Sequence, residues 1–166
     1  MKTVLKLDNK TLFLVRHGLS TLNKRGYGRK KLTADLLPQG IIDAEKAAGY
    51  LKNIHDSHNF SSDIPRCKQT AEIISRITGK LFHYDKRLTE FYHETFTDFK
   101  KRIINFLEEL PAVSESNIII CTHAAVVVAI KYLITEDKFI RMDLADEPLE
   151  GEIVILKRGG IIKKMR

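Results

Sequence analysis

The sequence has few cysteines, no long apolar run and no segment of linker composition, and each absence excludes a class of protein. Only two of the 166 residues are cysteine, too few for a disulfide framework, so Cys67 and Cys121 are expected to be reduced thiols in a cytoplasmic protein. The longest apolar stretch, Ile118–Ile130, is interrupted by a threonine and a histidine and is shorter than the roughly 20 residues that a membrane span requires. The first eight residues lack the uninterrupted apolar core of a signal peptide.

Repeats, low-complexity tracts and Pro/Gly/Ser-rich linkers are also missing, which argues against a division into several domains. A chain of this length buries roughly 70% of its unfolded surface without help from a disulfide or a metal. The content of 43% hydrophobic and 30% charged residues is typical of a globular protein. We therefore expect residues 1–166 to form a single soluble domain.

Positive charge is in excess and gathers at two places. The 28 Lys and Arg residues outnumber the 21 Asp and Glu residues, for a formal net charge of +7, and basic residues cluster within residues 24–31 and 157–166. This excess favours an anionic partner, which could be nucleic acid, an acidic lipid or a phosphorylated small molecule, although such runs are also common on solvated faces. Tyr27 is the only aromatic residue in the first cluster, so a stacking surface for nucleic acid is not expected.

Short apolar segments alternate along the chain with amphipathic segments of helical period. Strands are expected at residues 4–7, 11–15, 59–62, 81–84, 117–121, 152–156 and 161–165, with the first two and the last two as hairpins. Helices are expected from Pro38 and at residues 66–77, 96–110 and 124–134, with Gly79 ending the second. The alternation predicts an α/β fold: a single-domain three-layer α/β/α sandwich with a mostly parallel central sheet and an antiparallel edge strand.

The polar residues best suited to chemistry follow three of the expected strands. Arg16 and His17 come directly after the first buried strand, Arg66 opens a helix after another, and His123 follows the most apolar strand. Because ligands of α/β proteins bind at the carboxyl ends of the strands, we expect these side chains to meet there. Arginine forks and helix N-termini suit a phosphate dianion. The sequence therefore predicts a phosphate-binding site.

Four blocks in this order resemble the signatures of the histidine phosphatase superfamily, the phosphoglycerate-mutase-like proteins. They are residues 14–23 with Arg-His-Gly and a later Asn, residues 62–71 with an arginine before Gln-Thr-Ala, residues 88–90 with Leu-Thr-Glu, and residues 121–123 with Cys-Thr-His. Leu32-Thr33 and Pro38-Gln39-Gly40 are similar to the start of the family's first helix. An Arg-His-Gly triplet alone is a weak signal, but the order and spacing agree across residues 12–130.

The resemblance implies phosphoryl-transfer chemistry that needs no metal or other cofactor. In this chemistry neutral His17 is the nucleophile and becomes a phosphohistidine. Glu90 protonates the leaving oxygen and then takes a proton from the attacking water. The groups that bind the phosphoryl oxygens are, by the same resemblance, Arg16, Asn23, Arg66, His123 and Ala124.

Three departures from the family pattern leave alternatives open. The family usually has glycine after its second histidine, whereas Ala124 and Ala125 follow here, which matters if that position needs a positive φ. Glycine often stands four residues after the acid, but that residue here is Glu94, so either Glu90 or Glu94 could be the general acid. Only one helix and one strand fit between Glu90 and His123, where mutases of the family carry a long helical insertion. The chain therefore resembles a short member with a minimal cap.

A minimal cap favours hydrolysis, because a mutase must keep water away from its phosphorylated intermediate. The leading interpretation is a phosphatase that acts on a small phosphorylated metabolite or a phosphoprotein. The alternatives are phosphoglycerate-mutase-type phosphoryl transfer and a non-catalytic relative that binds a phosphorylated ligand. The basic cluster at residues 24–31 suggests the further hypothesis that substrates with more than one negative group are selected. No nucleic acid or membrane partner is expected, and the oligomeric state stays open.

Overall fold

The computed structural model describes residues 7, 9–22, 29–157 and 160–165, with the backbone alone at residues 29–30 and 161–163. These residues form one six-stranded sheet in the order β3-β2-β4-β1-β5-β6. The strands are β1 (Thr11–Arg16), β2 (Ser57–Ser61), β3 (His83–Tyr84), β4 (Asn117–Thr122), β5 (Ile153–Lys157) and β6 (Gly160–Met165). The first four in chain order run parallel, whereas β5 is antiparallel to β1 and β6 to β5. The expected antiparallel edge is therefore a two-stranded hairpin.

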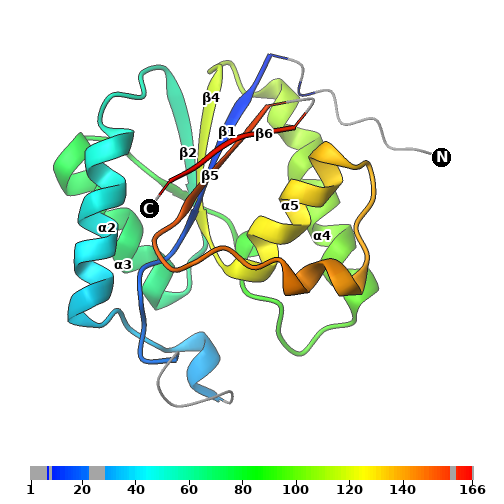
Figure 1. Cartoon of the computed structure of the whole chain (residues 1–166), viewed down its shortest axis with the longest axis horizontal. Coiled ribbons are helices and arrows are strands. Elements are labelled where there is room, and N and C mark those ends of the chain that lie inside the picture. The colour runs from blue at the N-terminus through cyan, green and yellow to red at the C-terminus, as the bar shows by residue number, and fades with distance from the viewer. Residues whose placement is uncertain (1–6, 8, 23–28, 158–159, 166) are drawn as a thin grey trace.

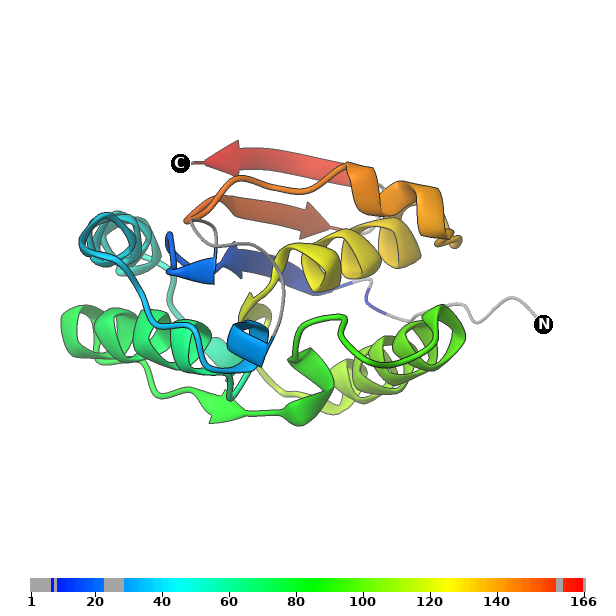
Figure 2. The same cartoon turned by 90° about the horizontal axis from the view of Figure 1, so that it is seen from below.

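Helices cover both faces of this sheet. The α-helices are α2 (Pro38–Leu51), α3 (Pro65–Thr78), α4 (Phe96–Glu109) and α5 (Ala124–Thr135). Figure 1 shows α2 and α3 on one side of the sheet and α4 and α5 on the other, and Figure 2 shows the strands stacked between them from β6 to β3. Short 3-10 helices occur at η1 (Arg29–Leu32), η2 (Lys86–Leu88), η3 (Leu110–Ala112) and η4 (Arg141–Ala145). The predicted three-layer α/β/α sandwich is confirmed.

The apolar runs of β1 and β4 are explained by burial on both faces of the sheet. Leu12 and Leu14 of β1 belong to the core beneath α4 and α5, whereas Phe13 and Val15 belong to the core beneath α2 and α3. The residues of β4 alternate between the two cores in the same way. A strand covered by helices on both sides has no solvent face to mark with polar residues, so it appears as an unbroken apolar segment.

Most predicted element limits agree with the structure, and Gly79 ends α3 with a φ of +74° as expected. The hairpin predicted from residues 4–7 lies outside the described residues except for Leu7, which is not part of a strand.

The carboxyl ends of β1, β2 and β4 lie level with one another. The register pairs Arg16 with Thr122 and Ser61 with Cys121. Two helices, α3 and α5, begin just beyond these strand ends, so their positively polarised N-termini lie at the same edge of the sheet. No helix in the described part of the chain is long and apolar enough to cross a membrane.

Candidate active site

Five of the predicted site residues meet at this edge. Arg16 is the last residue of β1, and the backbone N–H of His17 donates to the carbonyl of Thr122 at the end of β4. Arg66 lies in the first turn of α3, and His123 caps the start of α5. Glu90 follows η2 and approaches both of them. Asn23, predicted to bind phosphate, lies outside the described residues.

Arg66 is at the centre of this cluster and is fully buried, with 0% of its surface exposed. Its Nε donates to His17 Nε2 at 3.0 Å, and its Nη2 lies 3.0 Å from His123 Nδ1 and 3.4 Å from Glu90 Oε2. Its Nη1 donates to the carbonyl of Lys31 at 2.6 Å. Burial lowers the pKa of Arg66, but the neighbouring Glu90 carboxylate opposes that effect. A guanidinium is thus fixed at a buried position beside two imidazoles.

The hydrogen bonds of His17 define which ring nitrogen carries the proton. Nδ1 lies 2.8 Å from the carbonyl oxygen of Gly18, which can only accept, so Nδ1 is the protonated nitrogen. Nε2 accepts from Arg66 and therefore holds the lone pair. Burial, followed by the charge of Arg66, holds the pKa of His17 well below its ordinary value. At neutral pH this side chain is an uncharged imidazole with a nucleophilic Nε2.

His123 is neutral for similar reasons but has the opposite tautomer. Its Nδ1 faces the Nη2 donor of Arg66, and its Nε2 lies 2.9 Å from the hydroxyl of Ser62, to which it donates. Burial is the main cause that lowers the pKa of His123 well below its usual range, and Arg66 adds to it. The rings of His17 and His123 are 5.3 Å apart between centroids. Ser62 was not assigned a role from the sequence, although its position directly after β2 was a usable signal.

The two cysteines lie in the core beside this cluster. Both are free and buried, and the Cys67 sulfur lies 3.4 Å from His123 Nε2. Burial, together with the neighbouring Cys121, raises the pKa of the Cys67 thiol well above its ordinary value. A buried neutral thiol is a poor nucleophile, which agrees with a packing role.

The structure distinguishes between the two candidate acids. Glu90 lines the pocket with a side chain 11% exposed, and its Oε2 lies 3.7 Å from His123 Nδ1. Glu94 instead forms an ion pair with Arg102 of α4, with 2.5 Å between Oε1 and Nη2. Glu94 is not among the residues that line the pocket. Of the two candidates, Glu90 is therefore the one whose carboxylate lies at the pocket.

The loop after His17 is held by the residues of the Gln-Thr-Ala and Pro-Gln-Gly motifs. The hydroxyl of Thr70 accepts from Gly18 N at 3.3 Å, and Gln69 bonds both Asp35 and the backbone of Leu36. Gly18 and Gly40 pack backbone to backbone: a Cβ on Gly18 would lie 2.1 Å from the carbonyl oxygen of Gly40. These motif residues therefore fix the loop that follows His17.

A pocket of about 580 Å³ opens over the cluster, lined among others by Arg16, His17, Glu90 and Ala124. Ala124 begins α5 and is not among the residues with positive φ, so no glycine is needed there. The first N–H groups of a helix have no partner within the helix and suit an anion. Within the described residues, no group of three or more His, Cys, Asp or Glu side chains is arranged to hold a metal ion.

The side chain of Arg16 also lines this pocket, and its partners differ from those of Arg66. Its Nη1 donates to the carbonyl of Pro148 at 2.5 Å, and its Nη2 lies 3.1 Å from Glu150 Oε1. Both partners belong to the loop between η4 and β5, which carries none of the sequence blocks that indicated the site. No motif in the sequence could have identified them, because the contact joins residues more than 130 positions apart.

Comparison with known proteins agrees with this geometry. Residues 12–93 match the model of the family described as histidine phosphatase superfamily (branch 1). The "Putative phosphoserine phosphatase 2" of Hydrogenobacter thermophilus is 28% identical, with 76% of this chain and 79% of that protein covered. The 2,3-bisphosphoglycerate-dependent phosphoglycerate mutase of Thermoplasma acidophilum is 37% identical over 82 residues, 49% of this chain and 41% of the mutase. The alpha-ribazole phosphatase from Shigella flexneri has the same fold, with a TM-score of 0.77 at 18% identity over 92% of this chain and 93% of that one.

An α/β/α sandwich with two neutral histidines around a buried arginine suits the binding of a phosphoryl group. The match over residues 12–93 and the shared fold make the chain similar to the histidine phosphatase superfamily. The two of these relatives that match over most of their length are named as phosphatases, whereas the match to the mutase covers less than half of it.

Proposed function

We propose that this protein is a metal-independent phosphomonoester hydrolase that acts through a phosphohistidine on His17. The observation that carries this proposal is the tautomer of His17. A neutral imidazole with its Nε2 lone pair beside Arg66 is both nucleophilic and next to the charge that a phosphoryl group requires.

The first half-reaction transfers the phosphoryl group to His17. A substrate phosphate takes over the N–H groups of Arg66, which frees Nε2 to attack phosphorus as the ester P–O bond breaks. Once the phosphate has displaced Glu90 from Arg66, the carboxylate takes up a proton from solvent and gives it to the leaving oxygen, so that the alcohol departs neutral. Arg16 and the N-terminus of α5 at Ala124 bind the remaining phosphoryl oxygens.

His123 changes its protonation in this scheme. In the free protein its Nδ1 lone pair faces Arg66, so it cannot donate to a phosphate. A bound dianion offsets the charge of Arg66 and raises the pKa of His123, so that Nδ1 can gain a proton and donate to a phosphoryl oxygen. Water then attacks the phosphohistidine, Glu90 accepts its proton, and the Nε2–P bond breaks.

The surroundings of the pocket support hydrolysis over mutase transfer. Between Glu90 and His123 the chain forms only α4, η3 and β4, and none of these lines the pocket. Water can therefore reach the phosphohistidine, which a mutase must prevent. We propose a small phosphorylated metabolite as the substrate and the cytoplasm as the location, where Cys67 and Cys121 stay reduced.

The test is to look for the phosphoenzyme directly. Wild-type protein and His17→Ala are mixed with an aryl phosphate in EDTA, and phosphate release and acid-labile phosphate on the protein are measured. We expect turnover and a trapped phosphohistidine in the wild type and neither in the variant. Equal rates in both proteins would contradict the proposal, and turnover that EDTA abolishes would contradict its metal independence.

A further inference from the structure

The pocket extends beyond His17 along a wall formed by the loop before β5. This wall comprises Leu144 and residues 147–150. In the reaction proposed above, the phosphoryl group occupies the His17 end, so the wall faces the part of the substrate that leaves as the alcohol. The chemistry of the wall therefore bears on which alcohol fits.

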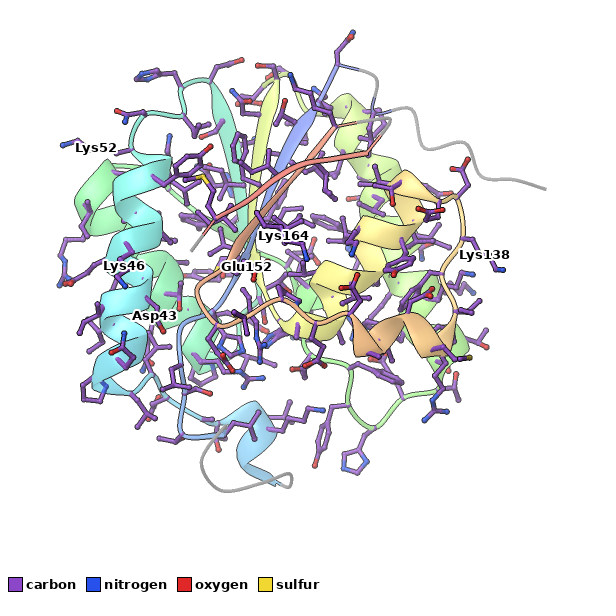
Figure 3. The ribbon with its side chains drawn as sticks, in the orientation of Figure 1. Asp43, Lys46, Lys52, Lys138, Glu152 and Lys164 are labelled. Carbon is purple, nitrogen blue, oxygen red and sulfur yellow. The ribbon has the colours of Figure 1, made fainter. Side chains whose placement is uncertain are left out.

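The position of the wall relative to the nucleophile is fixed by hydrogen bonds. Gly151 N donates to the carbonyl oxygens of Arg16 and His17, each at 3.2 Å. Glu152, directly before β5, accepts from Leu149 N at 3.1 Å, and its other oxygen lies 4.0 Å from Nζ of Lys164 on β6 (Figure 3). The wall is thus tied to the backbone that carries the nucleophile.

The cations near the pocket already have partners in the protein. Arg16 is held by Glu150 and the carbonyl of Pro148, and the amine of Lys31 donates to the carbonyl of Phe91 at 3.1 Å. Arg66, behind His17, is required for the phosphoryl group itself. Lys31 keeps its charge beside a neutral carbonyl, but it is bonded to Phe91 and not to the wall, and the described residues of the wall include no cation.

The carboxylates of the pocket equal these cations in number. They are Glu90, Glu147 and Glu150, against Arg16, Lys31 and Arg66. Glu90 is beside Arg66 and Glu150 beside Arg16, whereas Glu147 is exposed and has no ion pair with any described residue. Although the whole chain has a net charge of +7, the described residues of the wall present one carboxylate without an ion pair, that of Glu147.

We propose that Glu147 makes the pocket selective for monophosphates of alcohols that carry an amine, and that it disfavours a second phosphate or a carboxylate. The proposal rests on the function proposed above and names its substrate class. It is the opposite of the preference for several negative groups that the basic cluster at residues 24–31 suggested from the sequence. A unit charge several ångströms away in a solvent-exposed site changes binding by about three- to tenfold.

The experiment uses three substrates of equal length that differ only in the end group. They are 3-aminopropyl phosphate, 3-hydroxypropyl phosphate and 3-phosphonooxypropanoate. We expect kcat/KM to fall in that order, by about tenfold from the amine to the carboxylate at low salt, and the difference to shrink in about 1 M salt, where the Debye length is roughly 3 Å. Glu147→Gln should make the three kcat/KM values equal, and Glu147→Lys should reverse the order of the substrates.

The control is Glu108→Lys on α4, which makes the same charge change at an exposed residue outside the pocket lining. It should leave the order of the substrates unchanged. A wild-type preference for the carboxylate substrate, or an order that Glu147→Lys does not alter, would overturn the inference while leaving the phosphatase function intact.

A binding measurement separates this inference from the proposed function. The non-hydrolysable analogues 3-aminopropylphosphonate and 3-phosphonopropanoate are titrated by calorimetry into the wild type and Glu147→Lys. The amine should bind more tightly to the wild type and the carboxylate to the variant, whether or not the protein turns over any phosphate ester. Equal affinities for the two phosphonates in both proteins would reject the role of Glu147.

Discussion

Two pairs of histidines lie close together in this structure, and only one pair belongs to the candidate site. His17 and His123 follow the carboxyl ends of β1 and β4, with ring centroids 5.3 Å apart. His58 and His83 lie near the amino ends of β2 and β3 and stack at 4.9 Å. The second pair is the closer of the two, so the distance between rings does not distinguish a site from a surface contact.

The difference lies in what surrounds each pair. His17 and His123 are 2% and 0% exposed, and both bond to the buried Arg66. His58 is 29% exposed in its side chain and lies 3.5 Å from Glu115, while His83 is exposed at the sheet edge. Burial keeps the first pair neutral, and a guanidinium beside it supplies the charge that a phosphate needs. The comparison teaches that the arginine and the burial, rather than the histidines alone, make the site.

Replacing Arg66, which distinguishes the two histidine pairs, should cause the largest loss of activity. Arg66→Lys keeps one positive charge but cannot reach His17, His123, Glu90 and the Lys31 carbonyl at once. We expect kcat/KM for an aryl phosphate to fall by roughly 10²–10³-fold, as for the loss of one preorganised oxyanion donor. The free energy of unfolding should fall by about 1–3 kcal/mol, because buried acceptors lose their partner.

The control for this change is Arg76→Lys, at an exposed position in the last turn of the same helix. Steady-state kinetics and urea unfolding of both variants measure the two effects. If Arg66→Lys retained wild-type kcat/KM, Arg66 would be a structural residue and the contrast between the histidine pairs would lose its main cause.

Replacing the proposed acid, Glu90, should cause the next largest loss of activity. The size of the loss should depend on the leaving group of the substrate. Glu90→Gln removes the proton donor, so kcat for an alkyl phosphate should fall by about 10²–10³-fold. An aryl phosphate with an acidic phenol needs less protonation and should be affected less. Glu94→Gln breaks only the ion pair with Arg102 and should leave both rates within about twofold. The opposite ranking of the two variants would make Glu94 the acid.

Part of this site follows from the sequence because its residues depend on local signals. The helices α3 and α5 begin soon after β2 and β4, so Arg66 and His123 could be assigned to the sheet edge from strand and helix patterns alone. The choice of Glu90 over Glu94 could not be made that way. It depends on the ion pair between Glu94 and Arg102, which forms only after α4 packs against the loop.

The outer wall of the pocket is a part of the site that could not be predicted from the sequence. Glu150 and Pro148 bind Arg16 from a loop with neither a motif nor regular periodicity. Their approach is fixed by the β5–β6 hairpin pairing beside β1, a long-range arrangement that composition and period do not encode. The charge preference suggested by the basic cluster at residues 24–31 stays a hypothesis, because Lys31 is the only member of the cluster whose side chain is described.

The burial of His17 and His123 should make the free energy of unfolding depend on pH. We expect this effect to be of intermediate size. The unfolded chain binds a proton at each histidine near pH 6.5, whereas His17 and His123 in the folded protein resist protonation. The unfolded state therefore binds more protons below that pH. Stability contributed by these residues is complete above pH 6.5 and falls as the pH drops, by up to about 1.4 kcal/mol per unit for each histidine.

Urea unfolding between pH 7.5 and 5 measures this slope, above the range in which most carboxylates titrate. His17→Asn should reduce the slope, because one buried neutral histidine is removed, and His83→Asn, at an exposed position, is the control. Equal slopes in all three proteins would mean that the two histidine pairs do not differ in protonation, against the comparison made above.

The smallest effect should come from Ala124→Gly, which restores the glycine usual in the family. The phosphate-binding group at this position is the backbone N–H, which both residues have, and the backbone of Ala124 does not need the positive φ that favours glycine. We expect kcat/KM to stay within about twofold and stability to fall by at most about 1 kcal/mol, because glycine is a weaker helix former than alanine in α5. Steady-state kinetics and thermal unfolding provide the two values. A tenfold gain in kcat/KM would instead show that the methyl group of Ala124, which lines the pocket, obstructs the substrate.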